Sequence, residues 1–345
     1  RLREALARPL DLCGVAIELG SSIGIAYRGD HGRDLGTLLR RADVAMYEAK
    51  HGRSGIATYD RTRDPYSPDR LALASELRRG IERGELELHF QPKVAVGDGR
   101  VTGAEALVRW NHPERGLLAP DAFIPLAERT GVIGALTRWV IDTALAQVRT
   151  WDEQGIDLPV AVNLSGADVL DAGLADAVRA ALDRAGVPGD RLECEISEDT
   201  VLADPARAIE SLTRLRAMGV RMTLDDFGSG HASLLYLRRF AFDKIKLDRS
   251  LVQTMESTGE SAMIVRTTLE LAEGLGLAVT AKGVETEEQQ MLLKTFGCKE
   301  IQGFQQAPAL PLEALCDLLA AREAAAARDA AVIPFIAGGT QRRDI

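Results

Sequence analysis

The sequence predicts an α/β protein whose main domain is a TIM-like (β/α)8 barrel. From about residue 76 to residue 320, segments with the character of strands alternate with segments of helical periodicity. About eight strands with intervening helices in roughly 250 residues is the pattern of this barrel class. Polar residues also stand at the ends of most strand candidates, where such barrels build their active sites.

The first 60 residues are predicted to be the end of a smaller α/β domain. Residues 22–26 are a short strand candidate. Residues 34–50 have their apolar side chains on one face and predict an amphipathic helix, which Gly52 would end. A closing strand is expected at residues 56–59.

The domain boundaries follow from breaks in these patterns. A polar stretch with two prolines and no periodicity predicts a linker at residues 61–75, with a helix over residues 69–83. The barrel domain is expected to cover residues 76–325. An alanine-rich helix should end near Arg328, and residues 326–345 are expected to be a loose tail.

The barrel elements can be placed in order along the chain. The strand candidates are residues 86–94, 101–109, 160–163, 192–196, 221–224, 244–247, 278–281 and 300–302. Clear helical patterns occupy residues 133–154, 174–185, 206–218, 262–275 and 287–296. The first two strands are joined by Gly97-Asp98-Gly99, a hairpin signal, so this pair is predicted to be antiparallel.

The composition limits the classes of partner. The chain is 46% apolar and 27% charged, as in ordinary globular proteins. Its net charge of −9 argues against binding along DNA or RNA. No stretch approaches the ~20 continuous apolar residues of a membrane span, and no signal peptide is visible.

The cysteines and the first residue bear on the cellular compartment and on whether the chain is part of a longer protein. Cys13, Cys194, Cys298 and Cys316 form no C-x-x-C pair, which predicts reduced, mostly buried thiols in a cytoplasmic protein. The chain starts with Arg1 rather than Met, so it is expected to be a fragment of a longer protein. A membrane anchor upstream of Arg1 is compatible with the sequence.

Polar residues at the strand ends predict the chemistry. In a barrel these ends lie on one face, so the side chains should converge. A single carboxylate there is usually a helix cap or an ion-pair partner. Several carboxylates with an asparagine would repel one another unless divalent cations bind, and oxygen ligands favour Mg²⁺ or Mn²⁺. An Asp-Asp pair suits two close ions, an arrangement common in phosphodiester hydrolysis. The residues are Glu105, Asn163, Glu195, Glu198, Asp225, Asp226, Lys246, Asp248, Lys282 and Gln302.

With these motifs in place, residues 76–320 resemble the EAL domain of cyclic di-GMP phosphodiesterases. The resemblance rests on motifs in the same order, among them Gln91-Pro92-Lys93, Glu105-Ala106-Leu107, Asn163-Leu164-Ser165, Asp225-Asp226-Phe227-Gly228 and Lys246-Leu247-Asp248. It implies a metal-dependent hydrolase that opens the cyclic dinucleotide to linear pGpG.

The resemblance also implies roles for individual residues. Glu105, Asn163, Glu195 and Asp225 match the ligands of a first metal ion, with Asp225 bridging to a second ion held by Asp226. Lys246 matches the lysine that orients the attacking water. Glu198 matches the acid that steadies the glycine-containing loop after Asp226. Arg109, Gln302, Gln91 and Leu107 are the candidate ligand-binding residues, with Arg109 on a phosphate.

One departure from the family pattern concerns the second metal ion. The family has Glu-Gly-Val-Glu where this chain has Lys282-Gly283-Val284-Glu285. A lysine beside a dication is repelled, and unit charges ~4 Å apart at an effective dielectric of 20 cost about 4 kcal/mol. The lysine predicts a weakened second site and slower turnover, unless it points away or replaces part of the metal's charge. His231, where the family usually has Tyr, is interpreted as a surface residue.

Residues 1–60 resemble the closing third of a GGDEF domain, through residues 22–26 and 41–50. The signature loop that binds GTP is absent from this chain, so cyclase activity is not expected of it. The preferred interpretation of the whole is a cytoplasmic cyclic di-GMP phosphodiesterase. The alternative is an inactive cyclic di-GMP receptor disabled by Lys282, and a scaffold is the weakest reading. A homodimer and an upstream sensor or GGDEF domain are expected partners.

Overall fold

The computed structural model describes residues 10–12, 15–17, 21–51, 55–61, 64, 68–228, 240 and 242–337. These residues divide into two compact units, Arg1–Glu76 and Leu77–Ile345. The predicted loop residue His231 and the cysteine Cys13 lie outside the described residues.

The first unit is built around one β-α-β connection. Strands β3 (Ile23–Ile25) and β4 (Ile56–Thr58) pair in parallel, and helix α2 (Leu35–His51) joins them. Val44, Ala45 and Tyr59 form its small buried core. A hairpin of β1 (Leu10–Leu12) and β2 (Val15–Ile17), which the sequence did not predict, precedes this connection.

Helix α3 (Pro68–Arg83) leads into the second unit and covers part of the predicted linker 61–75. Proline is tolerated in the first turn of a helix because its missing N–H has no partner there. Leu73 and Leu77 are buried on one side of the helix.

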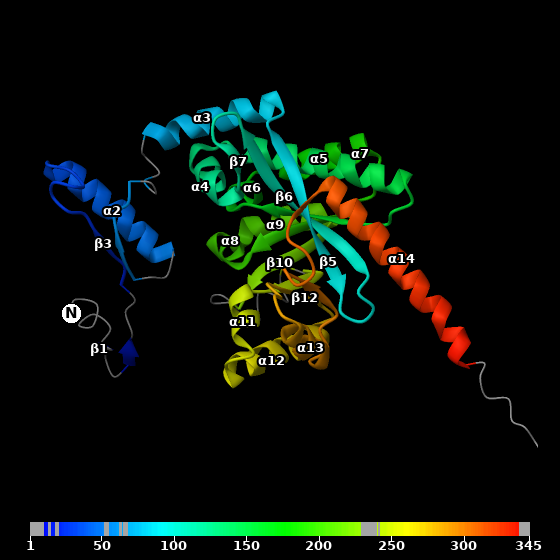
Figure 1. Cartoon of the computed structure of the whole chain (residues 1–345). Coiled ribbons are helices and arrows are strands. Elements are labelled where there is room, and N and C mark those ends of the chain that lie inside the picture. The colour runs from blue at the N-terminus through cyan, green and yellow to red at the C-terminus, as the bar shows by residue number, and fades with distance from the viewer. Residues whose placement is uncertain are drawn as a thin grey trace, which may run out of the picture. The chain divides into compact units, whose positions relative to one another are not determined.

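The second unit is the predicted barrel, and its eight strands form a closed ring (Figure 1). The ring runs β5-β13-β12-β11-β10-β9-β8-β6 and closes from β6 back to β5. Strand β5 is antiparallel to both of its ring neighbours, β6 and β13, and the other neighbouring pairs are parallel. In the hairpin between β5 and β6, Gly99 has a φ of 71°, a conformation that glycine adopts without steric cost. The ring strands are β5 (Leu86–Ala95), β6 (Val101–His112), β8 (Val160–Leu164), β9 (Leu192–Ser197), β10 (Arg221–Phe227), β11 (Lys244–Leu247), β12 (Ala278–Lys282) and β13 (Glu300–Gln302).

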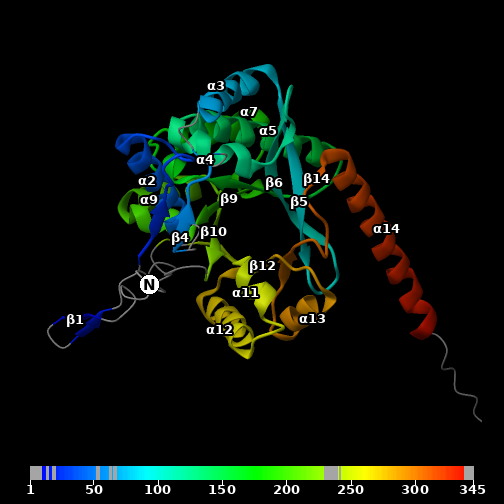
Figure 2. The ribbon, with the colours of Figure 1, turned by 60° about the vertical axis from the view of Figure 1, so that its left-hand side comes forward.

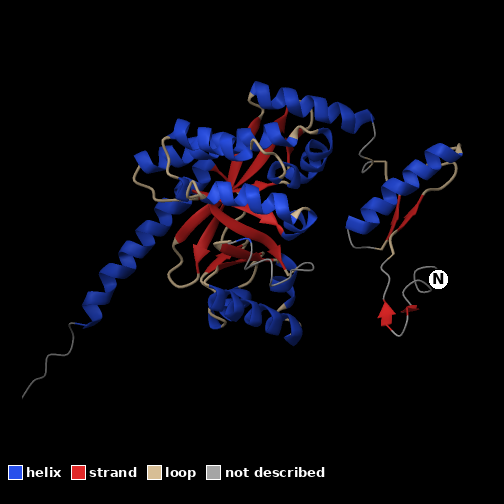
Figure 3. Ribbon diagram, turned by 180° about the vertical axis from the view of Figure 1, so that it is seen from behind, coloured by secondary structure: helices blue, strands red, loops and turns tan. Residues whose placement is uncertain are grey.

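Helices cover the outside of the ring, as the view from behind in Figure 3 shows. The long helices lie close to their predicted positions, whereas the short helices α6, α8 and α11 and the helix α4 had not been assigned. Two short strands, β7 (Gly116–Leu118) and β14 (Leu310–Pro311), extend the sheet beyond the ring. The helices are α4 (Pro120–Thr130), α5 (Ile133–Glu153), α6 (Gly166–Val169), α7 (Leu174–Ala185), α8 (Glu198–Ala203), α9 (Pro205–Arg216), α11 (Arg249–Thr254), α12 (Gly259–Leu275), α13 (Glu287–Thr295) and α14 (Leu312–Ala337), with a 3-10 turn at Gly189–Arg191.

The predicted tail at residues 326–345 is wrong in its first part. Helix α14, which starts beside β5 and β14, continues to Ala337 (Figure 2). Residues 326–333 contain no glycine and four alanines, which have the highest helix propensity. Pro334 removes one backbone hydrogen bond but stands only three residues before the helix ends.

Two further features concern the thiols and the length of the helices. Cys194 and Cys298 are buried, Cys316 is partly buried, and all three are free thiols. Within the described residues, no helix combines the length and the apolar character needed to span a bilayer.

The barrel interior is charged rather than apolar. Lys93 of β5 reaches Glu193 and Glu195 of β9, with N–O distances of 2.8 Å to each. Because β5 and β9 are not neighbours in the ring, these side chains meet inside it. Ordinary TIM barrels fill this space with bulky branched residues. Here the residues that alternate with the charged ones, such as Ile245 and Leu247, are the buried apolar side chains.

Glu300 is the first residue of β13 and lies at the end of the barrel interior where the parallel strands begin. Its carboxylate accepts hydrogen bonds from Lys244 at 2.8 Å, from Thr102 at 2.6 Å and from Thr280. Lys244 also contacts Glu193 at 3.3 Å. Burial acts to raise the pKa of Glu300, but the charges of Lys244 and Lys93 and the hydrogen bonds outweigh burial and lower it.

The first prediction concerns the loops at the carboxyl end of the ring. A Cβ atom on Gly303 would lie 2.1 Å from the carbonyl oxygen of Val284, so Gly303→Ala requires a backbone shift. We expect it to lower the free energy of unfolding by ~2 kcal/mol or more, measured by urea denaturation. The control is Gly97→Ala, whose Cβ meets nothing within 4 Å. Equal stability of the two variants would contradict this close approach.

The second prediction concerns pH. Because the pKa of Glu300 is lowered in the folded chain, the unfolded chain binds its proton first as the pH falls. The stability from Glu300 is present above the unfolded pKa of about 4.3 and is lost as the pH falls through the lower folded pKa. Glu300→Gln should therefore lose less unfolding free energy than the parent between pH 6 and pH 3.5. Parallel losses in urea titrations would show that Glu300 is not a source of the acid sensitivity.

Candidate active site at the carboxyl end of the barrel

The paired aspartates share one side of β10 because the strand is irregular there. Successive residues of a regular strand point to opposite faces. Between Leu224 and Phe227, however, two residues of β10 stand opposite one residue of β11, as in a β-bulge. Asp226 has a φ of 56°, and the described residues contain no other non-glycine residue with a positive φ. Both carboxylates can therefore reach the same cation.

That cation is Lys282, from the end of β12. Its ammonium group lies 2.8 Å from Asp225 Oδ1 and also pairs with Asp226. Burial acts to lower the pKa of Lys282, but Asp225 and Asp226 outweigh burial and raise it, so the group stays charged. Lys282 therefore points toward the aspartates and not away from them.

A second cluster joins Glu105, Asn163, Glu195 and Lys246. The ammonium of Lys246 lies 2.7 Å from Glu105 Oε2 and 2.5 Å from Glu195 Oε2. Asn163 donates to Glu105 at 2.7 Å. Asn163 and Glu195 stand opposite each other in the pairing of β8 with β9. The structure thus brings three of the four predicted ligands of a first metal together around Lys246, and the fourth, Asp225, lies on the neighbouring strand β10 in contact with Lys282.

Burial and neighbouring charges act in opposite directions on these groups. Burial favours the neutral form of Glu105, but Lys246 and several hydrogen bonds hold its pKa well below the usual range. Burial and the charge of Glu105 raise the pKa of Glu195, against the effect of Lys246 and Lys93. Lys246 is fully buried, and Glu105, Glu195 and Asp225 nevertheless keep its pKa well above the ordinary value.

The side chains present at the site determine how many metal ions it can bind. In the described part of the chain, no three acidic, histidine or cysteine side chains converge closely enough to hold a metal as they stand. Ammonium groups of Lys246 and Lys282 occupy the space between the carboxylates. Three carboxylates and an amide on adjacent strands nevertheless fit one hard divalent cation. Asp226 does not fit a second ion, because Lys282 already neutralises it.

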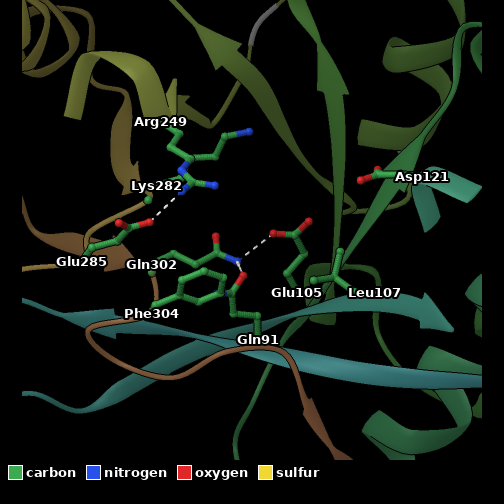
Figure 4. A pocket seen from close by; sticks show the side chains of 11 residues that line it. Gln91, Glu105, Leu107, Asp121, Arg249, Lys282, Glu285, Gln302 and Phe304 are labelled. Atoms are coloured by element: carbon green, nitrogen blue, oxygen red, sulfur yellow. Dashed lines mark hydrogen bonds and ion pairs between the residues drawn. The ribbon is translucent and has the colours of Figure 1, made fainter. Parts of the chain in front are cut away.

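A pocket of about 490 Å³ lies beside these clusters (Figure 4). Of the predicted site residues, Gln91, Glu105, Leu107, Lys282 and Gln302 line it. The sequence interpretation missed its other side chains. They are Asp121, Arg249, Glu285 and Phe304, together with Gly283 and Gly303.

Some of the missed residues had a sequence signal. Arg249 directly follows Asp248, and Phe304 follows the Gln302-Gly303 motif. Phe304 is 63% exposed and lines the pocket, so its ring is accessible to a planar ligand. Arg249 pairs with Glu285 at 2.7 Å at the rim.

A chain of amide hydrogen bonds orients Gln302. Gln91 donates to the carbonyl of Ala307 at 3.1 Å and accepts from Gln302 at 3.1 Å. Gln302 also donates to Glu105 at 2.7 Å. Its Oε1 atom is among the few buried polar atoms of the described residues that have no partner. This oxygen can accept a hydrogen bond from a ligand hydroxyl or N–H group.

Two predicted residues take positions that do not test their roles. Arg109 is absent from the described lining of the pocket, and its guanidinium donates to the carbonyl of Val108 at 3.0 Å. Glu198 is buried at the start of α8, whereas the loop that it was predicted to steady lies outside the described residues.

Comparison with known proteins gives consistent matches. A family model described as the EAL domain matches residues 74–309. The bifunctional diguanylate cyclase/cyclic di-GMP phosphodiesterase MucR of Pseudomonas aeruginosa is 40% identical over 91% of this chain and 46% of its own length. An uncharacterized signaling protein of Caulobacter vibrioides is 42% identical over 91% of this chain and 39% of its own length. The chain thus spans less than half of either relative.

A solved structure agrees with the sequence matches. The structure of the MucR phosphodiesterase in complex with cyclic di-GMP covers 71% of this chain and 99% of its own, at 42% identity and a TM-score of 0.68. The family match covers most of the chain, and it includes every strand of the ring and every site residue described above. The chain belongs to the EAL domain family.

Proposed function

We propose that this chain hydrolyses cyclic di-GMP to linear pGpG with Mg²⁺ or Mn²⁺, and that Lys282 slows the reaction. The observation that carries the proposal is the convergence of Glu105, Asn163, Glu195 and Asp225 beside Lys246 and an open pocket. Family membership supports it, because relatives of this family are named as cyclic di-GMP phosphodiesterases.

The chemistry requires a water to attack phosphorus while the P–O3′ bond breaks. The products are a 5′-phosphate and a free 3′-hydroxyl on one linear dinucleotide. A divalent cation held by Glu105, Asn163, Glu195 and Asp225 would activate the water and stabilise charge on the phosphate oxygens.

The residues of the chain position the reactants. Lys246, which pairs with Glu105 and Glu195, is the proposed residue to orient the attacking water. Gln302 offers an acceptor to the bound nucleotide, and Leu107 and Phe304 offer apolar contact area to the bases. Arg109 stays the proposed contact to a phosphate. The pocket supplies orientation rather than a covalent nucleophile.

Lys282 favours a second candidate function. Its ammonium group sits on both carboxylates that would otherwise serve a second ion. If one ion is not enough for turnover, the chain is a receptor that binds cyclic di-GMP without cleaving it. Retention of the first ligand set and of Lys246 makes hydrolysis the preferred proposal.

We also propose that residues 1–60 are the C-terminal part of a GGDEF domain. The β3-α2-β4 connection and the bifunctional cyclase name of the MucR relative support this. The free thiols support a cytoplasmic setting. The homodimer stays a prediction.

The third prediction separates the two functions. Lys282→Glu should bind a second Mn²⁺ per chain and raise the rate of pGpG formation at least ~10-fold, equivalent to about 1.4 kcal/mol of barrier. The control is Lys294→Glu on α13, which makes the same charge change on an exposed side chain. Metal content is measured by mass spectrometry and hydrolysis by chromatography.

Three outcomes decide between the candidates. Hydrolysis by the parent supports an enzyme as it stands. Binding by both proteins with hydrolysis only by Lys282→Glu identifies the parent as a receptor. If neither protein hydrolyses or binds cyclic di-GMP, both proposals are wrong.

A further inference from the structure

Lys93 contacts Glu195, one of the predicted metal ligands, although the proposed reaction does not require Lys93 to contact the nucleotide. Its side chain is 1% exposed. Its ammonium group lies 2.8 Å from one oxygen of Glu193 and 2.8 Å from Oε1 of Glu195. It enters from β5, on the far side of the ring from β9.

Glu195 is held at both of its oxygens. Lys93 binds Oε1, and Lys246 binds Oε2 at 2.5 Å. The same Lys246 group binds Glu105, so the Oε2 side of Glu195 faces the other predicted metal ligands. Rotation of the carboxylate would break the contact with Lys93 and leave a fully buried cation short of a partner, which is costly.

We propose that Lys93 is a positioning residue that orients Glu195 for the divalent cation and thereby sets the affinity of that site. The inference rests on the metal site of the proposed function. Residues that orient metal ligands usually change metal affinity 10–100-fold when they are replaced.

Lys244 provides a matched comparison inside the same barrel. It is a partly buried lysine of the interior, 16% exposed, and it also contacts Glu193, at 3.3 Å. Its other partner is Glu300, at 2.8 Å, and no contact joins it to Glu195. Loss of Lys244 therefore disturbs the interior charges without releasing Glu195.

The experiment compares Lys93→Met with Lys244→Met in the full chain. Urea unfolding gives the stability of each variant, and titration calorimetry with Mn²⁺ alone gives the metal affinity. Both variants should lose stability, since each leaves a buried carboxylate with one partner fewer. We expect Lys93→Met to raise the Kd for Mn²⁺ by about 10–100-fold and Lys244→Met to change it less than about 3-fold.

A double variant guards against loss of folding. Lys93→Gln with Glu193→Gln removes one positive and one negative charge, so the interior keeps its net charge. We expect it to fold and still to bind Mn²⁺ about 10-fold more weakly than the parent, because Oε1 of Glu195 has lost its ammonium partner.

The outcomes separate this inference from the proposed function. Unchanged Mn²⁺ affinity in folded Lys93→Met, an equal loss in Lys244→Met, or failure of both Lys93 variants to fold would each overturn the role of Lys93. If instead the parent binds no Mn²⁺, or Asp225→Asn binds it as the parent does, the metal site itself is wrong.

Discussion

Compensation of buried charge inside the barrel is the constraint on which the rest of the structure depends. The strands place lysines and glutamates in the space that other barrels fill with aliphatic side chains. Each of these groups is stable there only because an opposite charge stands within hydrogen-bond distance. Removal of one partner from a buried pair typically costs 3–5 kcal/mol, so the interior tolerates few changes. This network also includes the candidate active site, because its members toward the carboxyl ends of the strands are the predicted metal ligands.

The number of charges at the site bears on how Lys282 affects metal binding. The described ion pairs of the interior and of the aspartate pair together contain six carboxylates and four ammonium groups, which leaves two negative charges when every group is ionised. The carboxylates are Glu105, Glu193, Glu195, Asp225, Asp226 and Glu300, and the ammonium groups are Lys93, Lys244, Lys246 and Lys282. One divalent cation would neutralise the remainder. A glutamate at position 282 would leave four negative charges, which two such cations would neutralise, so the lysine takes the electrostatic place of one ion.

The local backbone geometry of β10 allows one lysine to pair with both aspartates. Asp225 and Asp226 are adjacent in sequence and would diverge on a regular strand. The bulge in β10 and the left-handed conformation of Asp226 bring both carboxylates to Lys282. Backbone irregularities of this kind are often found beside active sites, where they redirect a side chain. The close packing of Gly303 against Val284 joins the loops after β12 and β13, which supply Gly283, Glu285 and Phe304 to the pocket wall.

The sequence by itself determined the barrel, the positions of its eight ring strands and the set of residues at the strand ends, because alternating apolar patterns and polar strand ends are local signals. Glu105, Asn163, Glu195, Asp225 and Lys246 could be named in this way. The inward direction of Lys93, Glu193, Lys244 and Glu300 was not recognised, although the alternation in Glu193-Cys194-Glu195 indicates it for Glu193. Only the tertiary structure decided that Lys93 crosses the ring to Glu195 and that Lys282 turns toward both aspartates. These contacts join strands that are far apart in sequence, and their geometry depends on ring closure and on one bulge, which no local pattern encodes.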